Sequence, residues 1–315
     1  MNFTYLPCYQ DKNEYFVRNS HIGKNSRVFT NDRVWSSENG TVFVYRRKQM
    51  ITSSTNQQVK NIKKLLKSSK ERNRQGVFVV EGIRMFREVP KEDLIAVFVT
   101  AEFAKKNQDI FADISYELMD EKVIKEISDT QTPQGVVAIV KQPRYELEQI
   151  LTDHHNAPNG KPCLVVLENL QDPGNLGTIL RTAEGAGVTG VLISKESVDV
   201  FNPKVIRSTM GAVYRIPFLY FDDIRSIITV LEENSIKTYA ACLGGTDFYK
   251  EQLLDGVAFL IGNEGNGLSD ESLALAQQKI LIPMCGEVES LNAAIATTVL
   301  TYETMRQRLK GGIEK

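Results

Sequence analysis

Residues 164–183 read LVVLENLQDPGNLGTILRTA, and this stretch decides the fold. An apolar run typical of a buried strand ends at Asp172-Pro173-Gly174, which signals a turn. A helical pattern follows and carries Asn175 and Arg181. Their separation is less than two helical turns, so both side chains can lean toward one end of the neighbouring sheet. Ligands of open α/β sheets bind beyond the carboxyl ends of the strands, so we expect a ligand site at this end.

The chain has 315 residues, which is long enough for two hydrophobic cores. Its apolar content of 42%, charged content of 24% and net charge of -1 are ordinary, and they neither favour nor exclude a nucleic-acid partner. No apolar run approaches the roughly 20 residues that span a bilayer, and the N-terminus lacks a signal-peptide pattern. We therefore expect a cytoplasmic protein without a membrane partner.

Four cysteines, at positions 8, 163, 242 and 285, lack the spacing of metal ligands. Three of them, Cys163, Cys242 and Cys285, lie in or beside apolar runs, which predicts small buried hydrophobic residues in a reducing compartment. Adjacent histidines, His154 and His155, lie in a polar loop with no third ligand nearby, so we predict no metal site.

The hydrophobic pattern divides the chain into four parts. Residues 1–50 form an extension whose order the sequence does not determine, and only residues 40–45 suggest a strand. Residues 51–141 alternate short strands and helices in a small α/β domain, and residues 142–161 form a polar linker. Residues 162–310 predict a second α/β domain with a mostly parallel sheet covered on both faces. Its expected strands are 163–167, 190–193, 213–218, 237–242, 257–261 and 279–282, and its expected helices are 175–186, 203–209, 222–234, 270–276 and 291–309.

A basic segment at residues 56–75 begins the small domain. Asn56 is a candidate N-cap, and Val59, Ile62, Leu65 and Leu66 form an apolar stripe at helical spacing. Seven cations surround this stripe, and only Glu71 opposes them: Lys60, Lys63, Lys64, Lys67, Lys70, Arg72 and Arg74. Two interpretations remain open, an ordinary solvated face and a nucleic-acid contact surface.

Two further stretches of the second domain carry candidate chemistry. Residues 259–269 read FLIGNEGNGLS, a buried strand that enters a glycine-rich turn, and residues 282–296 read IPMCGEVESLNAAIA, a loop that feeds an apolar helix. The glycine order is not that of a dinucleotide fingerprint, and Glu264 would repel a pyrophosphate. The turn can instead admit a flat uncharged ligand such as adenosine, or it is a structural turn before a capped helix.

Arg181 lies in an otherwise apolar or small-residue helix and is expected to need an anionic partner. Glu264 would serve as that partner in a buried ion pair, and a substrate phosphate would serve as well.

Together and in this order, the three stretches resemble the signature motifs of the SpoU (TrmH-like) family of RNA ribose 2'-O-methyltransferases, in the SPOUT superfamily. The resemblance extends over about residues 52–310, because the first domain resembles a ribosomal-protein-like substrate-binding domain that many members carry. It implies an α/β domain with a C-terminal trefoil knot, a homodimer, RNA as partner and S-adenosylmethionine as cofactor. Many members have a serine where this chain has Ala294, so the chain lacks that hydroxyl but keeps Ser290 and Asn292.

The resemblance also implies roles for individual residues. The reacting centre would comprise Asn175, Arg181, Glu264, Ser290 and Asn292, and the cofactor pocket Leu243, Gly244, Gly262, Asn263, Glu264, Gly265, Ile282, Met284, Leu291 and Asn292. RNA contacts would come from Lys60, Lys63, Lys64, Lys67, Arg72 and Arg74. A guanidinium is a poor base, so Arg181 is expected to orient the ribose hydroxyl and stabilise negative charge.

We therefore predict a methyltransferase that acts on a ribose 2'-hydroxyl. The first domain is commoner in members that modify ribosomal RNA, so we expect large-subunit ribosomal RNA as the substrate. The alternatives are a catalytically inactive RNA-binding protein of ribosome assembly on the same fold, and a transfer-RNA methyltransferase. A nicotinamide-dependent oxidoreductase would need a glycine fingerprint that the chain lacks.

Overall fold

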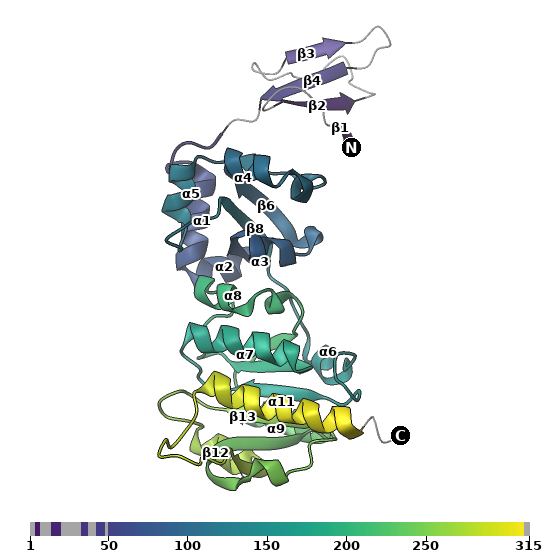
Figure 1. The fold of residues 1–315 in the computed structure, drawn as a ribbon, viewed down its shortest axis with the longest axis vertical. Helices are drawn as coiled ribbons and strands as arrows, with labels where there is room; N and C mark the ends of the chain where they lie inside the picture. The colour runs from purple at the N-terminus through teal and green to yellow at the C-terminus, as the bar shows by residue number, and fades with distance from the viewer. Residues whose placement is uncertain (1–3, 7–13, 20–32, 37–41, 48–49, 312–315) are drawn as a thin grey trace.

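The computed structural model describes residues 4–6, 14–19, 33–36, 42–47 and 50–311 (Figure 1). The first four ranges are the strands β1 (Thr4–Leu6), β2 (Glu14–Asn19), β3 (Arg33–Ser36) and β4 (Val42–Arg47), which form an antiparallel sheet in the order β1-β2-β4-β3. The strand expected at residues 40–45 is confirmed from residue 42 onward, and residues 40–41 lie outside the described ranges. The other three strands were missed, because single aromatic residues among polar ones give no clear alternation.

The small domain is a four-stranded sheet in the order β5-β8-β6-β7 with helices on both faces. Asn56 caps the first helix as predicted, since its Oδ1 accepts a hydrogen bond from the Gln58 backbone N–H at 2.8 Å. The elements are α1 (Gln57–Lys67), α2 (Ser69–Gln75), β5 (Val77–Glu81), α3 (Ile83–Glu88), β6 (Leu94–Val99), α4 (Ala101–Lys106), β7 (Glu117–Leu118), α5 (Glu121–Ile127) and β8 (Val136–Lys141), with 3-10 turns at Lys91–Asp93 and Gln108–Phe111.

The side chains of β5 alternate between two cores. Val77 and Val79 pack in a cluster with the buried residues of α1 and α5, whereas Phe78 and Val80 belong to a second cluster with Met85 of α3. Alternate residues of a strand point to opposite faces of its sheet. Helices α1 and α5 therefore cover one face of this sheet, and α3 and α4 cover the other.

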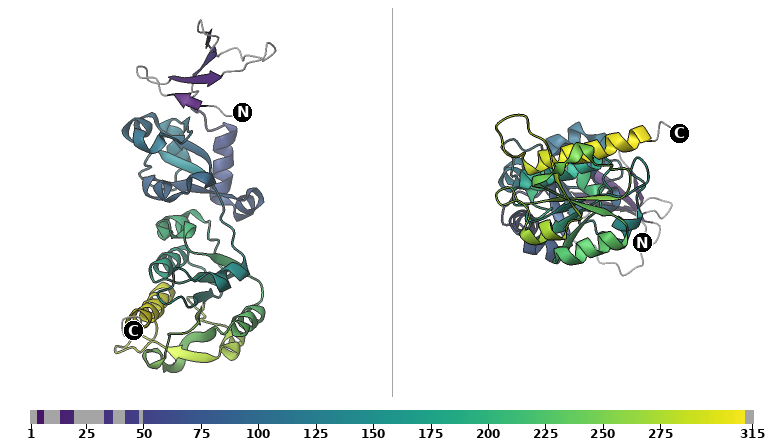
Figure 2. Two further views of the ribbon diagram at one scale, coloured as in Figure 1. Left: turned by 90° about the vertical axis from the view of Figure 1, so that its right-hand side faces the viewer. Right: turned by 90° about the horizontal axis from the view of Figure 1, so that it is seen from below.

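The second domain has a six-stranded sheet in the order β11-β10-β9-β13-β12-β14, and all of its neighbouring strands run parallel. Seen from below in Figure 2, the yellow C-terminal helix lies along one face and the green α9 along the other. Helix α6 (Leu147–Thr152) lies in the linker, and the domain comprises β9 (Cys163–Leu167), α7 (Pro173–Gly185), β10 (Gly190–Ser194), α8 (Pro203–Thr209), β11 (Phe218–Phe221), α9 (Ile224–Glu233), β12 (Lys237–Asp247), β13 (Val257–Ile261), α10 (Asp270–Leu275), β14 (Gln278–Leu281) and α11 (Ala293–Gly311), with 3-10 turns at Ala212–Tyr214 and Phe248–Lys250.

One predicted strand is wrong. The apolar residues of 213–218 suggest a strand, but Ala212–Tyr214 is a 3-10 turn and β11 begins only at Phe218. Gly211 precedes this turn with φ +91°, a left-handed conformation that favours glycine and bends the chain. Val213 and Ile216 are buried in this irregular segment, so their apolar character reflects core packing and not a sheet.

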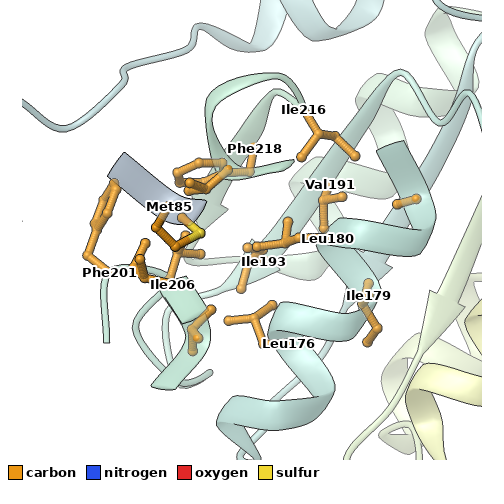
Figure 3. Close-up of a cluster of buried hydrophobic side chains, with 14 of the residues drawn as sticks. Met85, Leu176, Ile179, Leu180, Val191, Ile193, Phe201, Ile206, Ile216 and Phe218 are labelled. Atoms are coloured by element: carbon orange, nitrogen blue, oxygen red, sulfur yellow. The ribbon is translucent and has the colours of Figure 1, made fainter. Parts of the chain in front are cut away.

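One hydrophobic core spans both domains. Met85 of the first domain lies among Phe201, Ile206 and Phe218 of the second (Figure 3). The rings of Phe78 and Phe201 pack across the same junction with centroids 4.9 Å apart. Because protein cores are close-packed, this shared core fixes one domain relative to the other.

Arg72 ties the junction together and is not an exposed member of the basic segment. Its side chain is only 4% exposed, its Nε donates to Asp199 Oδ2 at 2.9 Å and its Nη1 donates to the Leu65 carbonyl at 2.7 Å. A cation buried against a carboxylate of the second domain has no surface for RNA. The predicted RNA contact of Arg72 is therefore wrong, and the signal missed was a charged side chain on the packed side of α2.

Replacing Arg72 tests whether this buried ion pair stabilises the protein more than an ordinary surface pair does. We expect Arg72→Met to lower the free energy of unfolding by about 3 kcal/mol, because the Asp199 carboxylate would lose its buried partner. The control is Arg74→Met, two residues away, whose exposed pair with Glu71 should contribute nothing measurable. Urea unfolding measures both; equal, small losses would show that the Arg72–Asp199 pair does not stabilise the junction.

Candidate functional site

Three segments meet at the carboxyl edge of the second sheet: the start of α7, the turn after β13 and the loop before α11. Their side chains form a continuous hydrogen-bonded chain. Asn175 Nδ2 donates to Glu264 Oε1 at 2.9 Å, and Asn292 Nδ2 donates to Asn175 Oδ1 at 2.9 Å. The sequence predicts these three residues at one centre, and the structure brings them together.

The hydrogen-bond partners of Asn175 and Asn292 allow only one orientation for each side-chain amide. An ionised Glu264 carboxylate only accepts hydrogen bonds, so the amide nitrogen of Asn175 must face it. Asn292 Oδ1 accepts the Ala294 backbone N–H at 2.9 Å, so its nitrogen must face Asn175. The three segments are therefore linked in a fixed direction, from the start of α11 to the glycine turn.

Glu264 is bound to the start of α7. Its carboxylate also accepts the backbone N–H groups of Gln171 at 3.2 Å and Asp172 at 3.0 Å. Burial acts to raise the pKa of Glu264, but the hydrogen bonds from Asn175 and these backbone groups outweigh it and lower the pKa below the usual value. Its stabilising effect is thus present above the unfolded-state pKa and is lost as pH falls through the lower folded-state pKa. The Glu264 carboxylate is thus held by three hydrogen bonds and joins the glycine turn to the start of α7.

Two neighbouring carboxylates complete this arrangement and were not singled out from the sequence. Asp172 Oδ1 accepts the Asn175 backbone N–H at 2.7 Å as the N-cap of α7, and Glu168 Oε2 accepts the Ser269 backbone N–H at 3.0 Å. An Asp directly before a helical Pro is an N-cap signal, so Asp172 was open to prediction. Glu168 gives no comparable local signal.

The glycine turn is a tight structure closed by its own backbone. Asn263 and Gly267 exchange two backbone hydrogen bonds, of 3.0 and 2.9 Å, and Asn263 Oδ1 accepts the Gly265 backbone N–H at 2.8 Å. A Cβ on Gly262 would lie 2.1 Å from the Gly267 carbonyl carbon, so no larger residue fits there. Gly265 has no such contact and is exposed.

A four-residue bulge at residues 242–245 interrupts β12, the strand next to β13. Ala241 and Thr246 of β12 both pair with Ile280 of β14, so the four residues between them have no partner in the register of the sheet. Leu243 is 64% exposed, which is high for an apolar side chain. Gly244 has φ +87° and open space around its Cβ position.

The loop at residues 282–292 leads from β14 to α11, and its last residue, Asn292, reaches Asn175. Ile282, Met284 and Leu291 are half-buried, whereas Ser290 is exposed and makes no hydrogen bond to another described residue. Cys285 in this loop is exposed, so its prediction as a buried residue is wrong. Cys163 is buried as expected, Cys242 is intermediate, and Cys8 lies outside the described residues.

Arg181 does not form a buried ion pair, which was one of the two expectations for it. It is exposed on α7, and it forms no ion pair or hydrogen bond with any other described residue. Glu264 is engaged instead by Asn175 and the start of α7, so of the two partners expected for Arg181 the structure contradicts Glu264 and leaves the substrate phosphate. The guanidinium is free to receive a ligand.

The basic helix α1 presents a lysine-rich surface on the first domain. Lys60, Lys64 and Lys67 are exposed without an ion pair among the described residues. Lys63 is paired with Glu126 at 2.9 Å and Arg74 with Glu71 at 2.7 Å. No three His, Cys, Asp or Glu side chains in the described part of the chain come together to hold a metal ion. Within the same residues, none of the helices has the length and apolar character to cross a membrane.

Comparison with known proteins identifies the family. The sequence model of the SpoU rRNA Methylase family matches residues 162–302, and that of the MRM3-like substrate binding domain matches residues 56–138. The chain is 29% identical over 256 residues to the 23S rRNA (guanosine(2553)-2'-O)-methyltransferase RlmP of Bacillus subtilis, a match that covers 81% of this chain and 98% of RlmP. It is 30% identical over 299 residues to the mitochondrial rRNA methyltransferase 3 of Mus musculus, which covers 77% of this chain and 70% of that protein. The fold matches the crystal structure of an AdoMet-bound rRNA methyltransferase from Sinorhizobium meliloti with a TM-score of 0.69 at 30% identity, over 82% of this chain and 97% of the other. The chain therefore belongs to the SpoU rRNA methylase family.

Proposed function

We propose that this protein transfers a methyl group from S-adenosylmethionine to a ribose 2'-hydroxyl of ribosomal RNA. The observation that carries the proposal is the Glu264–Asn175–Asn292 chain, which joins the three motif segments around the exposed Arg181. The bacterial relative is named a 2'-O-methyltransferase of 23S rRNA, the mitochondrial relative is named an rRNA methyltransferase, and the structural neighbour is an AdoMet-bound rRNA methyltransferase. The two family matches, to a substrate-binding domain at residues 56–138 and to the methylase domain at residues 162–302, support one enzyme built from both domains.

The three loop segments suit an adenosine moiety. Leu243 offers an exposed apolar face for the flat base, and Gly244 and Gly262 allow close approach to the backbone. The proposed cofactor residues are Leu243, Gly244, Gly262, Asn263, Glu264, Gly265, Ile282, Met284, Leu291 and Asn292. When bound, the cofactor supplies an electrophilic methyl group on a sulfonium.

Arg181 is the residue that we propose to act on the RNA. A guanidinium remains protonated in proteins, so it donates hydrogen bonds and does not serve as a general base. It would bind the phosphate beside the target ribose, orient the 2'-hydroxyl and stabilise the negative charge that develops on its oxygen. Asn175 and Glu264 would hold the start of α7 in place, and Ser290 and Asn292 would border the reacting centre.

Gly262 offers a direct test of the cofactor loop. We expect Gly262→Ala to weaken S-adenosylmethionine binding at least tenfold, because the added Cβ would displace the backbone of Gly267. The control is Gly286→Ala in the 282–292 loop, where a Cβ would meet nothing within 4 Å. Isothermal titration calorimetry measures both; equal affinities in the two variants would remove the glycine turn from the cofactor site.

We also propose that the chain is a homodimer through α11. Ile295, Tyr302 and Leu309 recur every seventh residue along this helix and are 53%, 41% and 49% exposed. An exposed apolar stripe at this spacing is typical of a helix that packs against another chain. Light scattering should give the mass of two chains, and Ile295→Asp should shift it to one; a single-chain mass for the unaltered protein would contradict the dimer.

A trefoil knot and a cytoplasmic location complete the proposal. Strand β14 lies at the edge of the sheet, yet α11 returns to pack against α7 and β13, which supports threading of the segment between them. The bacterial relative favours the cytoplasm, where ribosomes are made.

The ribosomal substrate is distinguished from a transfer-RNA substrate by direct assay. Labelled methyl transfer should be seen with unmodified large-subunit ribosomal RNA and should be absent with transfer RNA. Methylation of transfer RNA alone would show that the substrate is transfer RNA and not ribosomal RNA. Cofactor binding without methylation of either RNA would favour an inactive RNA-binding protein.

A further inference from the structure

The first domain contains a groove that the proposed reaction leaves unassigned. Its volume is about 540 Å³, and it lies between α4 and α5 near the start of α3. Ile83, Phe103 and Pro133 supply apolar walls. Asn107 Nδ2 donates to the Phe103 carbonyl, and Gln134 Oε1 accepts the Ile83 backbone N–H, which leaves Asn107 Oδ1 and Gln134 Nε2 without partners among the described residues. One free acceptor and one free donor beside apolar walls suit the edge and face of an unstacked base.

The rim of the groove is electrically balanced. Lys106 and Lys125 lie on it together with Glu102 and Glu121, and all four side chains are exposed. Two cations against two anions give little attraction for phosphate. The groove by itself therefore favours a base and not a phosphate group.

Two unpaired arginines lie next to the groove on α3. Arg84 and Arg87 are exposed, and neither forms an ion pair or a hydrogen bond with another described residue. Arg84 directly follows Ile83, which lines the groove, and residues three apart on a helix are neighbours on its surface. The pair is thus a site for the phosphates that would flank a base in the groove.

Contacts across the domain junction connect this surface to Arg181. Glu88 of α3 is paired with Arg215, and Arg215 Nε donates to Glu184 Oε1 of α7 at 2.9 Å. Glu184 is three residues after Arg181, so both lie on the same side of α7. Figure 1 shows α3 next to α8, at the junction of the two domains.

The loop that borders the groove is attached to the second domain as well. Arg207 of α8 donates to Asp129 Oδ2 at 2.8 Å, and the Asp129 backbone N–H donates to Glu81 at the end of β5. The groove, α3 and Arg181 therefore keep fixed relative positions. The lysines of α1 lie on the face of the sheet opposite α3, since α1 packs with α5 in one core and α3 packs in the other.

We infer that RNA crosses the first domain along α3, with its phosphates on Arg84 and Arg87 and one unstacked base in the groove. This inference rests on the proposed function, and it names the part of the first domain that selects the substrate. Fixed spacing between the groove and Arg181 would then determine which ribose reaches the methyl group. The lysines of α1, on the opposite face, would add at most weak contacts at a distance from the target.

Neutralising the two arginines tests the inference. We expect Arg84→Ala/Arg87→Ala to raise KM for ribosomal RNA roughly tenfold and leave kcat and S-adenosylmethionine affinity unchanged, since only ground-state RNA contacts are lost. The slope of log binding constant against log salt should fall by about 1.4, which corresponds to two contacts with single-stranded RNA. Lys106→Trp should obstruct the groove and also raise KM for ribosomal RNA. The control is Arg225→Ala on α9, an exposed residue paired with Glu271 outside both sites.

The alternative outcomes separate this inference from the function on which it rests. The proposed RNA path along α3 is wrong if Arg84→Ala/Arg87→Ala keeps KM within about twofold of the wild type. It is also wrong if Lys60→Ala/Lys64→Ala alone raises KM for ribosomal RNA. Neither result contradicts the methyltransferase function. If the wild type transfers no methyl group to RNA, the proposed function itself fails. Melting curves confirm that each variant is folded before its KM is compared.

Discussion

Arg181→Ala should lower the rate of methyl transfer by about a thousandfold while S-adenosylmethionine binding stays within about twofold of the wild type. The position of the guanidinium explains why we expect the rate to fall while cofactor binding is kept. Arg181 is exposed and forms no hydrogen bond or ion pair with Glu264 or the glycine turn, so we expect its removal to leave the cofactor loops intact. The reaction would lose the group that orients the hydroxyl and stabilises charge on the attacking oxygen.

Arg181→Lys separates orientation from charge. A lysine keeps the positive charge but lacks the planar fork that binds phosphate through two hydrogen bonds, so we expect little recovery of the rate. Single-turnover transfer and calorimetry measure the two quantities. An Arg181→Ala enzyme with wild-type rate would exclude Arg181 from the reacting centre, and loss of cofactor binding would assign it to the cofactor pocket instead.

Arg308→Met should give the largest loss of stability, about 4 kcal/mol, because it leaves buried carbonyl groups without donors. Arg308 on α11 is 2% exposed. Its Nε donates to the Leu253 carbonyl, its Nη1 to the Lys161 carbonyl, and its Nη2 to the carbonyls of Pro162 and Asp255, over 2.6 to 3.1 Å. One side chain thus joins the C-terminal helix to the start of β9 and to the loop before β13.

Burial lowers the pKa of Arg308, although Asp255 and Cys163 oppose the shift. Among the described residues no carboxylate accepts a hydrogen bond from Arg308, so its stabilising effect comes from the carbonyl groups. Urea unfolding of Arg308→Met, compared with the exposed Arg225→Met, measures the effect. Equal midpoints in the two variants would show that the C-terminal helix is held by its apolar contacts alone.

Local signals in the sequence predicted most of the second domain. Strand 163–167, the helix at 203–209 and strand 257–261 are confirmed, because their apolar runs end at turn or cap residues. The convergence of Asn175, Glu264 and Asn292 was also predictable. Parallel strands bring the segments that follow them to one edge of the sheet.

The errors came from interactions between distant segments. Arg72 looks like its basic neighbours in sequence, and only the approach of Asp199, in the other domain, makes it a buried residue. Glu264 was one of two expected partners of Arg181, but the start of α7 binds that carboxylate instead. Arg308 drew no attention, because its four acceptors are backbone carbonyls that carry no residue-type signal.

The most direct test of the account is the identity of the methylated nucleoside. Unmodified large-subunit ribosomal RNA is incubated with the protein and isotopically labelled S-adenosylmethionine, digested to nucleosides and analysed by mass spectrometry, with Arg181→Ala in parallel. The account predicts the label on the ribose of one 2'-O-methyl nucleoside, made by the wild type and not by the variant. Label on a base, or equal labelling by both proteins, would contradict it.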